Sequence, residues 1–262
     1  MGRSDDISSI QSTLSDLEQR ASTLESKISV GDTGPKNGPI DKHIRIALVG
    51  PPGSGKSTQA TKLKNKFCIC HLPIGQVLRS QISRGTPGVK SARDVMGHSS
   101  LVTDETMIDL IRDEINNNKE CKNGFVLDDF PRNLTEARLL DQMLESQNQR
   151  LHHAIELGVS DTGLLESRIT GRLTHLASGR LYHTIFHPPK EYMKDDITGE
   201  PLVHRPDDTV KNTRDRLNIY RERMTLIPDY YKRKGIWREV DGSQGEGQVF
   251  NSILREIERE GS

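Results

Sequence analysis

The chain has 262 residues and no net formal charge at pH 7, since its 37 lysines and arginines balance its 37 acidic residues. This length suits one large domain with insertions, and the balanced charge argues against broad, non-specific binding of nucleic acid. The sequence has no apolar run of membrane-spanning length and no signal-peptide core, so it predicts a soluble protein without membrane contact.

Cysteine is rare in the chain. Cys68, Cys70 and Cys121 form no Cys-x-x-Cys pair and are too few for a metal framework. Free thiols in a reducing compartment are therefore expected, with one disulfide as the open alternative.

Residues 1–30 form a separate segment in which apolar residues recur at alternating three- and four-residue steps. The spacing predicts a heptad-like amphipathic helix of about three repeats through Ile7, Ile10, Leu14, Leu17, Ala21, Leu24 and Ile28. A helix this short is marginal alone in water. Two alternatives stay open: it packs on the protein's own body or is disordered, or it forms a short coiled coil with a helix of another chain. Residues 31–40 are rich in Gly and Pro and predict a linker.

From residue 44 onward, expected strands and helices alternate. Strands are expected at 44–49, 67–71, 124–128, 154–157 and 236–240. Helices are expected at 56–66, 75–84, 103–117, 133–148, 161–172, 207–224 and 246–260. Strands separated by helices predict an α/β fold, in which a parallel sheet has helices on both faces. Residues 173–206 are dense in His, Pro, Gly and Thr and predict an inserted subdomain with short β-like runs outside that sheet.

A phosphate-binding loop follows the first expected strand, because the segment from Gly50 to Ser57 matches the pattern G-x-x-x-x-G-K-[ST]. Its glycines allow backbone N–H groups to point inward, and the next helix adds its positive N-terminal end. Lys56 supplies an ammonium group for the outer phosphates, and the Ser57 hydroxyl suits a phosphate-bound Mg²⁺. The alternative, a Gly-rich turn before an ordinary helix, is disfavoured by the apolar strand before the loop. The sequence therefore predicts a nucleoside triphosphate site formed by Gly50, Pro51, Gly53, Ser54, Gly55, Lys56, Ser57 and Thr58.

The strand expected at 124–128 ends in acidic residues. Asp128 would lie at the carboxyl edge of the sheet, where ligands of parallel sheets bind. A carboxylate there, beside a phosphate loop, suits Mg²⁺ or its bound waters.

Arginines recur near this edge and near the insertion. A guanidinium group forms two hydrogen bonds to phosphate oxygens and keeps its charge, so these arginines are candidate phosphate ligands. For Arg214 a solvated surface position is expected. With Lys56 the candidates carry more positive charge than one triphosphate needs, which favours two phosphorylated substrates. The candidate phosphate ligands are Arg79, Arg132, Arg168, Arg172, Arg205 and Arg216.

Several segments resemble a long-form adenylate kinase of the nucleoside-monophosphate kinases, closest to the eukaryotic isoenzyme 2 type. These segments are Gly50–Gln59, Phe67–Leu72, Leu127–Arg132, Ile169–Arg172, Ser178–His183, Pro188–Lys190, Lys194–Glu200 and Arg205–Asp208. The resemblance covers residues 41–242 in order and with matching spacing. It is weak over the C-terminal tail and does not extend to the N-terminal segment.

The resemblance implies a monomeric kinase domain at 41–262, with a core, a nucleoside-monophosphate-binding arm at 74–103 and a lid at 172–208. The implied reaction is the reversible transfer of a phosphoryl group from MgATP to AMP, giving two ADP, with lid closure excluding water. The implied catalytic residues are Lys56, Arg132, Arg172, Arg205 and Arg216. Outside the loop, ATP would contact Arg172, Tyr182 and His183, and Mg²⁺ would be held by Ser57 and Asp128, directly or through water. AMP would contact Gly75, Arg79, Leu101, Val102, Asp129, Arg132, Glu136, Arg205 and Arg216.

Four positions of the implied lid carry zinc-binding cysteines in related lids. Here they are His175, Ser178, Asp195 and Thr198. Because two of these side chains are hydroxyls, a hydrogen-bonded polar cluster is expected and zinc is not.

The chain departs from the family pattern mainly on the acceptor side. Gln76 replaces an aspartate, Asp129 a glycine, Ser99-Ser100 a Gly-Lys pair, and Glu136 a glutamine that reads the acceptor adenine. A carboxylate only accepts hydrogen bonds, so Glu136 suits guanine or leaves adenine N1 unpaired. Asp129 adds negative charge near the incoming phosphate and a side chain where the backbone passes the base closely.

Three functions follow from these observations. The favoured one is an active adenylate kinase that is slower or looser in its specificity than its relatives. The alternatives are a nucleoside-monophosphate kinase that accepts GMP, and a nucleotide-binding structural or sensor protein tethered through its N-terminal helix. The cytosol is the expected compartment, with the mitochondrial intermembrane space as the alternative that the resemblance implies; the acidic residues of the N-terminal segment argue against a mitochondrial presequence.

Overall fold

The computed structural model describes residues 43–83 and 103–259, all within the compact unit Asp41–Ser262. The predicted helix at 1–30, the linker at 31–40 and most of the predicted arm lie outside the described residues. None of the described helices combines the length and the apolar composition that crossing a membrane requires.

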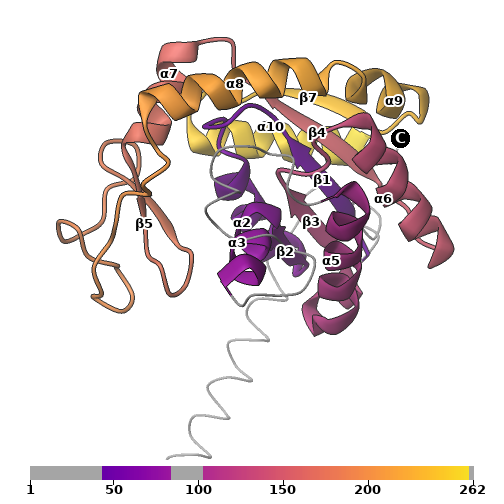
Figure 1. The fold of residues 1–262 in the computed structure, drawn as a ribbon, viewed down its shortest axis with the longest axis horizontal. Helices are drawn as coiled ribbons and strands as arrows, with labels where there is room; N and C mark the ends of the chain where they lie inside the picture. The colour runs from indigo at the N-terminus through magenta and orange to yellow at the C-terminus, as the bar shows by residue number, and fades with distance from the viewer. Residues whose placement is uncertain (1–42, 84–102, 260–262) are drawn as a thin grey trace, which may run out of the picture. The chain divides into compact units, whose positions relative to one another are not determined.

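Five parallel strands form the central sheet (Figure 1). They are β1 (Arg45–Val49), β2 (Cys70–Pro73), β3 (Phe125–Asp128), β4 (His153–Gly158) and β7 (Trp237–Asp241), in the order β2-β3-β1-β4-β7. Leu48 of β1 lies beside Asp128 of β3, and Val49 lies beside Glu156 of β4. The carboxyl ends of the three central strands therefore meet at one edge, beside the segment that follows β1.

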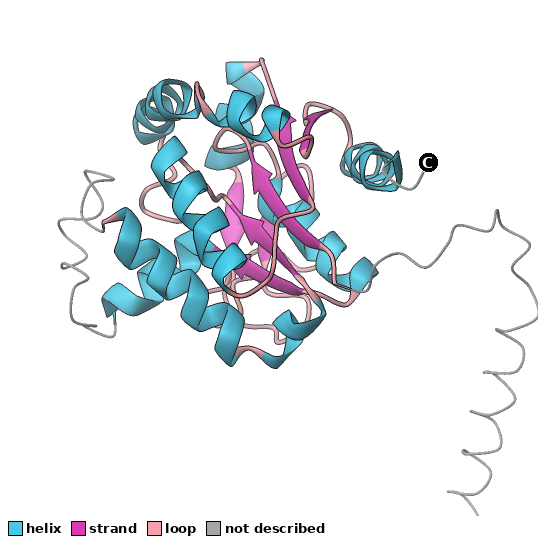
Figure 2. Cartoon of the chain, turned by 90° about the vertical axis from the view of Figure 1, so that its right-hand side faces the viewer, coloured by secondary structure: helices cyan, strands magenta, loops and turns pink. Residues whose placement is uncertain are grey.

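Helices cover both faces of the sheet (Figure 2). The helices of the described residues are α2 (Lys56–Phe67), α3 (Ile74–Ser83), α5 (Asp104–Asn117), α6 (Leu134–Ser146), α7 (Thr162–Thr170), α8 (Val210–Met224), α9 (Ile227–Arg233) and α10 (Glu246–Glu258), with a 3₁₀ turn η1 (Lys119–Asn123).

Strand β1 separates two hydrophobic clusters. Ala47 and Val49 pack with residues of α5, α6 and α9, such as Ile111. Ile46 and Leu48 pack with α2 and α10 on the other face. This alternation follows from the two-residue period of a strand, and it confirms the predicted α/β class.

Helix α5 illustrates how the sequence specifies an element. The hydroxyl of Thr103 accepts a hydrogen bond from the backbone N–H of Thr106 at 3.3 Å, which caps the first turn. Met107, Ile111 and Ile115 follow at four-residue steps and are buried.

The insertion after α7 has its own two-stranded antiparallel sheet, made of β5 (Arg172–Thr174) and β6 (Leu181–His183). It projects from the lower left of the view in Figure 1. Leu173, Tyr182 and Leu202 form a small core of their own. The predicted β-like runs outside the main sheet are therefore present.

Several predicted boundaries are displaced by two or three residues; the helix expected at 207–224, for example, begins at Val210 after its N-cap Thr209. The helix expected at 161–172 ends at Thr170, and Arg172 begins β5 instead, because Gly171 closes the last turn. The strand expected at 67–71 lies at Cys70–Pro73, since α2 continues to Phe67 and ends at Cys68, which has φ 53°. Helix α9 was not predicted, although Pro228 in its first turn is a helix-start signal.

The expectation of free thiols is wrong for two of the three cysteines. Cys70 of β2 and Cys121 of η1 form a disulfide, with their Cα atoms 4.7 Å apart. Both residues are buried in the cluster that packs against α5 and α6. Cys68 is exposed and free.

Candidate active site

The segment between β1 and α2 forms a loop whose backbone depends on glycine. A Cβ on Gly50 would lie 2.7 Å from the carbonyl oxygen of Leu157 in β4, which is closer than atoms can approach. Gly55 has φ 95° and precedes α2 without a side-chain cap, and the space that its Cβ would fill is open. The loop thus presents the uncapped N-terminus of α2 to an open space, which suits an anion.

Lys56 is the first residue of α2 and its side chain is only 8% exposed. Its ammonium group donates to the carbonyl oxygens of Gly50 and Pro51, at 2.7 and 2.9 Å. Its third partner is a carboxylate oxygen of Asp129, at 3.2 Å. The loop lysine is therefore held over its own loop and is paired with an acid that directly follows the neighbouring strand β3.

The hydroxyl oxygen of Ser54, in the middle of the loop, is buried without a hydrogen-bond partner. Within the described ranges the Nε atom of Arg216 is also buried without a hydrogen-bond partner. Since buried polar atoms are nearly always paired, both atoms are candidates for contact with a bound ligand.

Asp128 is the last residue of β3 and is 3% exposed. One of its carboxylate oxygens lies 3.1 Å from Nε2 of His71 in β2. This carboxylate and the hydroxyl of Ser57 are hard oxygen donors, and their chemistry fits Mg²⁺. Within the described ranges no group of three or more His, Cys, Asp or Glu side chains could hold a metal ion, so these two residues would supply only part of its ligands.

Asp129 and Arg132 form a second charged pair just beyond β3. Arg132 donates from Nε to the backbone oxygen of Asp129 at 3.1 Å, and its Nη2 lies 3.4 Å from the carboxylate. Partial loss of solvent around the half-exposed carboxylate raises the pKa of Asp129, but the charges of Lys56 and Arg132 outweigh this effect and lower that pKa overall. The carboxylate is therefore charged at neutral pH and bridges two cations.

Glu136 has a contact that the sequence did not reveal. Its carboxylate accepts the backbone N–H of Arg132, and its own N–H donates to the side chain of Asn133 at 2.8 Å. These bonds fix the first turn of α6 in the manner of a capping box. The side chain is 5% exposed, and burial raises the pKa of Glu136 although Arg132 opposes the shift.

A second group of arginines surrounds the two ends of the insertion. Arg172 donates from Nε and Nη2 to both oxygens of Asp208, at 2.8 and 2.5 Å. Nη2 of Arg216 in α8 lies 3.3 Å from the same carboxylate, and its Nη1 lies 3.4 Å from Asp207. Arg205 donates to the hydroxyl of Thr174 at 3.1 Å. Asp208 thus joins two predicted phosphate ligands in one ion-pair cluster.

Tyr182 and His183 have structural partners. The hydroxyl of Tyr182 donates to Asp195 at 3.0 Å and accepts from the N–H of Asp196 at 2.9 Å. Nε2 of His183 donates to the carbonyl of Ser167, and Nδ1 accepts two backbone N–H groups. Burial lowers the pKa of His183, in keeping with this neutral tautomer. Both side chains hold the insertion together, and their contact with ATP stays a prediction.

The polar cluster predicted within the insertion is present. Nδ1 of His175 lies 2.6 Å from the hydroxyl of Ser178, and the hydroxyl of Thr198 donates to Asp195 at 3.0 Å. Arg180 donates to both oxygens of Asp195, at 2.8 and 2.6 Å. These hydrogen bonds lower the pKa of Asp195, so this carboxylate is charged at neutral pH.

Some predicted acceptor residues are described by the structure only in part or not at all. Leu101 and Val102 are not among the described residues. Gly75 and Arg79 lie on α3, of which the structure describes the backbone at Arg79 but not the side chain. Their roles stay predictions.

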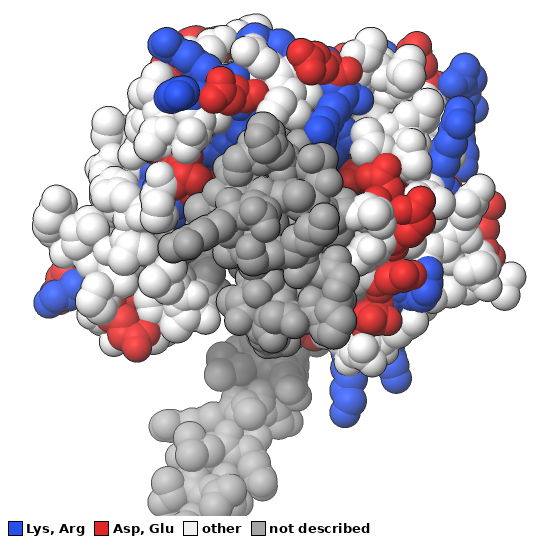
Figure 3. Space-filling view, in the orientation of Figure 1, with Lys and Arg blue, Asp and Glu red and all other residues white. Residues whose placement is uncertain are grey.

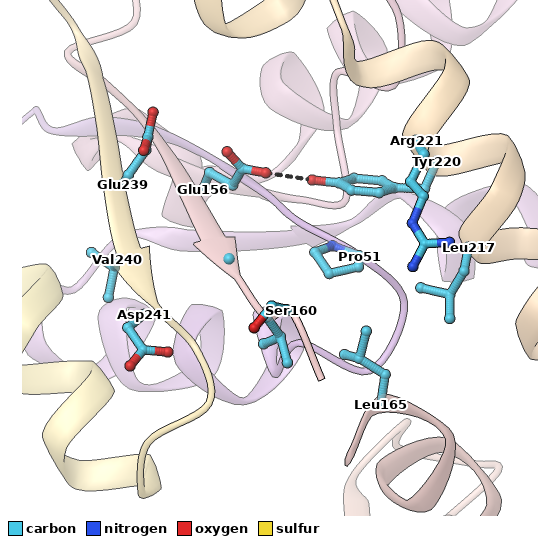
Figure 4. A pocket seen from close by; sticks show the side chains of 12 residues that line it. Pro51, Glu156, Ser160, Leu165, Leu217, Tyr220, Arg221, Glu239, Val240 and Asp241 are labelled. Carbon is cyan, nitrogen blue, oxygen red and sulfur yellow. Dashed lines mark hydrogen bonds between the residues drawn. The ribbon is translucent and has the colours of Figure 1, made fainter. Parts of the chain in front are cut away.

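Arg168 of α7, a candidate phosphate ligand from the sequence, donates to the backbone oxygen of Gly242 at 2.7 Å. Other residues near the loop were not predicted as part of the site. A pocket of about 550 Å³ is lined by Pro51 of the loop, by the carboxyl ends of β4 and β7 and by α8. Figure 4 shows the hydroxyl of Tyr220 pointing across this pocket to Glu156, to which it donates at 2.8 Å.

The visible surface has no single basic field. On the face shown in Figure 3, Lys and Arg lie in separate groups with Asp and Glu among them. This mixture agrees with the zero net charge of the chain.

Comparison with known proteins gives consistent matches. The family model described as adenylate kinase matches residues 48–236. An adenylate kinase of Emericella nidulans is 52% identical over 95% of this chain and 95% of its own length. Adenylate kinases of Aspergillus oryzae and Aspergillus terreus are each 49% identical over the same shares. These names do not specify an isoenzyme type.

Proposed function

The chain belongs to the adenylate kinase family of phosphotransferases, and we propose that the described site transfers the terminal phosphoryl group of MgATP to AMP. One observation carries the proposal. A single carboxylate, that of Asp129, lies 3.2 Å from the ammonium group of Lys56 and 3.4 Å from the guanidinium group of Arg132. The two cations are thus close enough to bind one anionic group between them, as phosphoryl transfer requires.

On the donor side, the loop from Gly50 to Thr58 would cradle the phosphates of ATP. The open space at Gly55 and the uncapped start of α2 support this role. The unpartnered hydroxyl of Ser54 lies in the same loop. Lys56 would move from the loop carbonyls to the outer phosphates.

On the acceptor side, Arg132 would bind the phosphate of AMP, with Arg79 beside it. Arg172, Arg205 and Arg216 would approach from the insertion, which acts as the lid. The unpartnered Nε atom of Arg216 supports a ligand there. The arginines would neutralise the negative charge on the transferred phosphoryl group in the transition state. Phosphoryl transfer depends mainly on such neutralisation and on positioning.

Mg²⁺ would be held by Ser57 and Asp128, in part through water, and would supply charge neutralisation at the donor phosphates when bound. His71 would orient the carboxylate of Asp128, to which it is hydrogen-bonded.

The alternative that the acceptor base is guanine, which was based on Glu136, is not favoured. Its carboxylate is already bound to the N–H of Arg132 and is buried at the start of α6. AMP is therefore the proposed acceptor, and GMP is not.

The compartment stays a proposal. The cytosol is the default expectation, but a disulfide between Cys70 and Cys121 is typical of oxidising compartments. This disulfide supports the mitochondrial intermembrane space over the cytosol.

The test is a parallel assay of phosphoryl transfer from MgATP to AMP, GMP, CMP and UMP. The proposal expects ADP formation to be fastest with AMP. A preference for GMP would restore the role of Glu136 in base selection. An absence of transfer to every acceptor, with ATP still bound, would favour a nucleotide-binding protein without turnover.

A further inference from the structure

Asp129 occupies a backbone position that favours glycine. Its φ is 69°, in the left-handed region, where Asp and Asn are the side chains best tolerated after glycine. Its N–H donates to the carbonyl of Leu48 at 3.1 Å, which fixes the turn after β3. A carboxylate at this position is therefore held at the ligand edge of the sheet by the backbone itself.

This carboxylate uses its two oxygens on two different cations. Oδ1 lies 3.2 Å from the ammonium group of Lys56, and Oδ2 lies 3.4 Å from Nη2 of Arg132. Such a bridge is the contact that a phosphate group would make with the same two side chains.

We propose that Asp129 is an affinity-determining residue of the site: its carboxylate occupies Lys56 and Arg132 in the nucleotide-free protein, and substrate phosphate must displace it. The inference rests on the proposed function, which assigns these two cations to phosphate. The carboxylate of Asp129 offsets one of the two positive charges of Lys56 and Arg132, so the attraction of this pair for an anionic ligand is lower.

The exposure of Asp129 makes displacement feasible. Its side chain is 46% exposed, whereas that of Asp208, the other bridging carboxylate, is 1% exposed. Asp208 also receives two hydrogen bonds from Arg172 and is enclosed by them. Asp208 therefore belongs to the framework, and Asp129 can rotate toward solvent when an anion arrives.

Both cations keep other anchors when the carboxylate is removed. Lys56 still donates to the carbonyls of Gly50 and Pro51, and Nε of Arg132 still donates to the backbone oxygen of Asp129. A neutral side chain at position 129 therefore frees the cations for phosphate without releasing them from the site.

The experiment compares the wild type with Asp129→Asn and Asp129→Gly in the full chain. Asparagine keeps the size and tolerates the left-handed backbone, so it isolates the charge; glycine also removes the side chain. Asp109→Asn is the matched control, because it removes an exposed carboxylate that pairs with Arg112 on α5, 2.8 Å away. Calorimetry measures the dissociation constants of AMP and of a non-hydrolysable ATP analogue, at low and at high salt.

We expect both Asp129 variants to bind at least one of these nucleotides roughly tenfold more tightly, as for the loss of one competing charge-assisted contact. The gain should shrink at high salt, because exposed charges are screened, and Asp109→Asn should bind as the wild type does. Unchanged or weaker binding in both Asp129 variants would overturn the inference and make Asp129 a supporting ligand. Because binding is measured without turnover, a wild type that fails to transfer phosphate would contradict the proposed function alone.

Discussion

At the scale of single residues, Glu136 shows how a position that resembles a base-reading site has a different use. Its carboxylate binds the N–H of Arg132, and its own N–H binds Asn133. It thereby connects the loop that carries a predicted phosphate ligand to the start of α6. Burial of this carboxylate raises its pKa above the ordinary value of 4.5.

We predict that Glu136→Gln stabilises the protein at neutral pH. An acid whose pKa is raised in the folded state binds a proton more tightly there than in the unfolded chain. Its ionisation therefore lowers the free energy of unfolding as pH rises above the ordinary value of 4.5. The amide keeps an acceptor oxygen and has no charge to bury. Urea unfolding should show a higher free energy of unfolding for the variant at neutral pH. This difference should disappear below pH 4.5, where the carboxyl group of Glu136 is protonated in both the folded and the unfolded chain.

Glu136→Ala is the companion variant. It removes the acceptor as well as the charge, and loss of a cap of this kind costs about 1 kcal/mol. A wild type that is more stable than Glu136→Gln at neutral pH would show that the interaction with the helix start outweighs burial.

The sequence identified the cations of the site but not their counter-ions. Lys56 and Arg172 follow from the loop pattern and from their place beside the insertion. The pairing of Arg172 with Asp208 joins residues 36 positions apart, and only the fold brings them together. Asp129 was predicted to add charge near phosphate, but its bridge to Lys56 depends on the parallel register of β1 and β3.

At the scale of elements, the disulfide between Cys70 and Cys121 links β2 to the 3₁₀ turn η1 across 51 positions of sequence. We predict that Cys121→Ser lowers the free energy of unfolding by about 2–4 kcal/mol, since the cross-link restricts the unfolded chain. Urea unfolding without reductant measures the difference.

Cys68→Ser is the control for this prediction, because Cys68 is exposed and free. Its stability should match that of the wild type. A reductant should lower the stability of the wild type toward that of Cys121→Ser, and equal stability of all three proteins without reductant would contradict the prediction.

The order and type of the main elements were predictable, because apolar runs alternate with amphipathic stretches along the chain. The strand order of the sheet was not predicted, since it depends on contacts between distant segments. Helix α9 was missed because it has only seven residues, too few for a helical period to be distinct. The predicted helix at 161–172 was too long because it included Arg172. Gly171 ends α7, and Arg172 begins β5, where it pairs with Asp208.

At the scale of the whole molecule, every residue that forms the described site belongs to the unit Asp41–Ser262. We therefore predict that deletion of residues 1–40 leaves kcat and KM for ATP and AMP unchanged. Steady-state kinetics and the sedimentation of both proteins test this. A change in assembly state with unchanged kinetics would support the coiled-coil alternative, whereas a loss of activity would show that the N-terminal segment contributes to the site.

The most direct test of phosphoryl transfer at this site is the rate of ADP formation from MgATP and AMP by the wild type and by Lys56→Met. Methionine keeps much of the length of the buried stem and removes the ammonium group. We predict ADP formation by the wild type and a loss of roughly a hundredfold or more in kcat for the variant, as for the removal of a major electrostatic contact to the transition state. Equal rates, or an inactive wild type, would contradict this prediction.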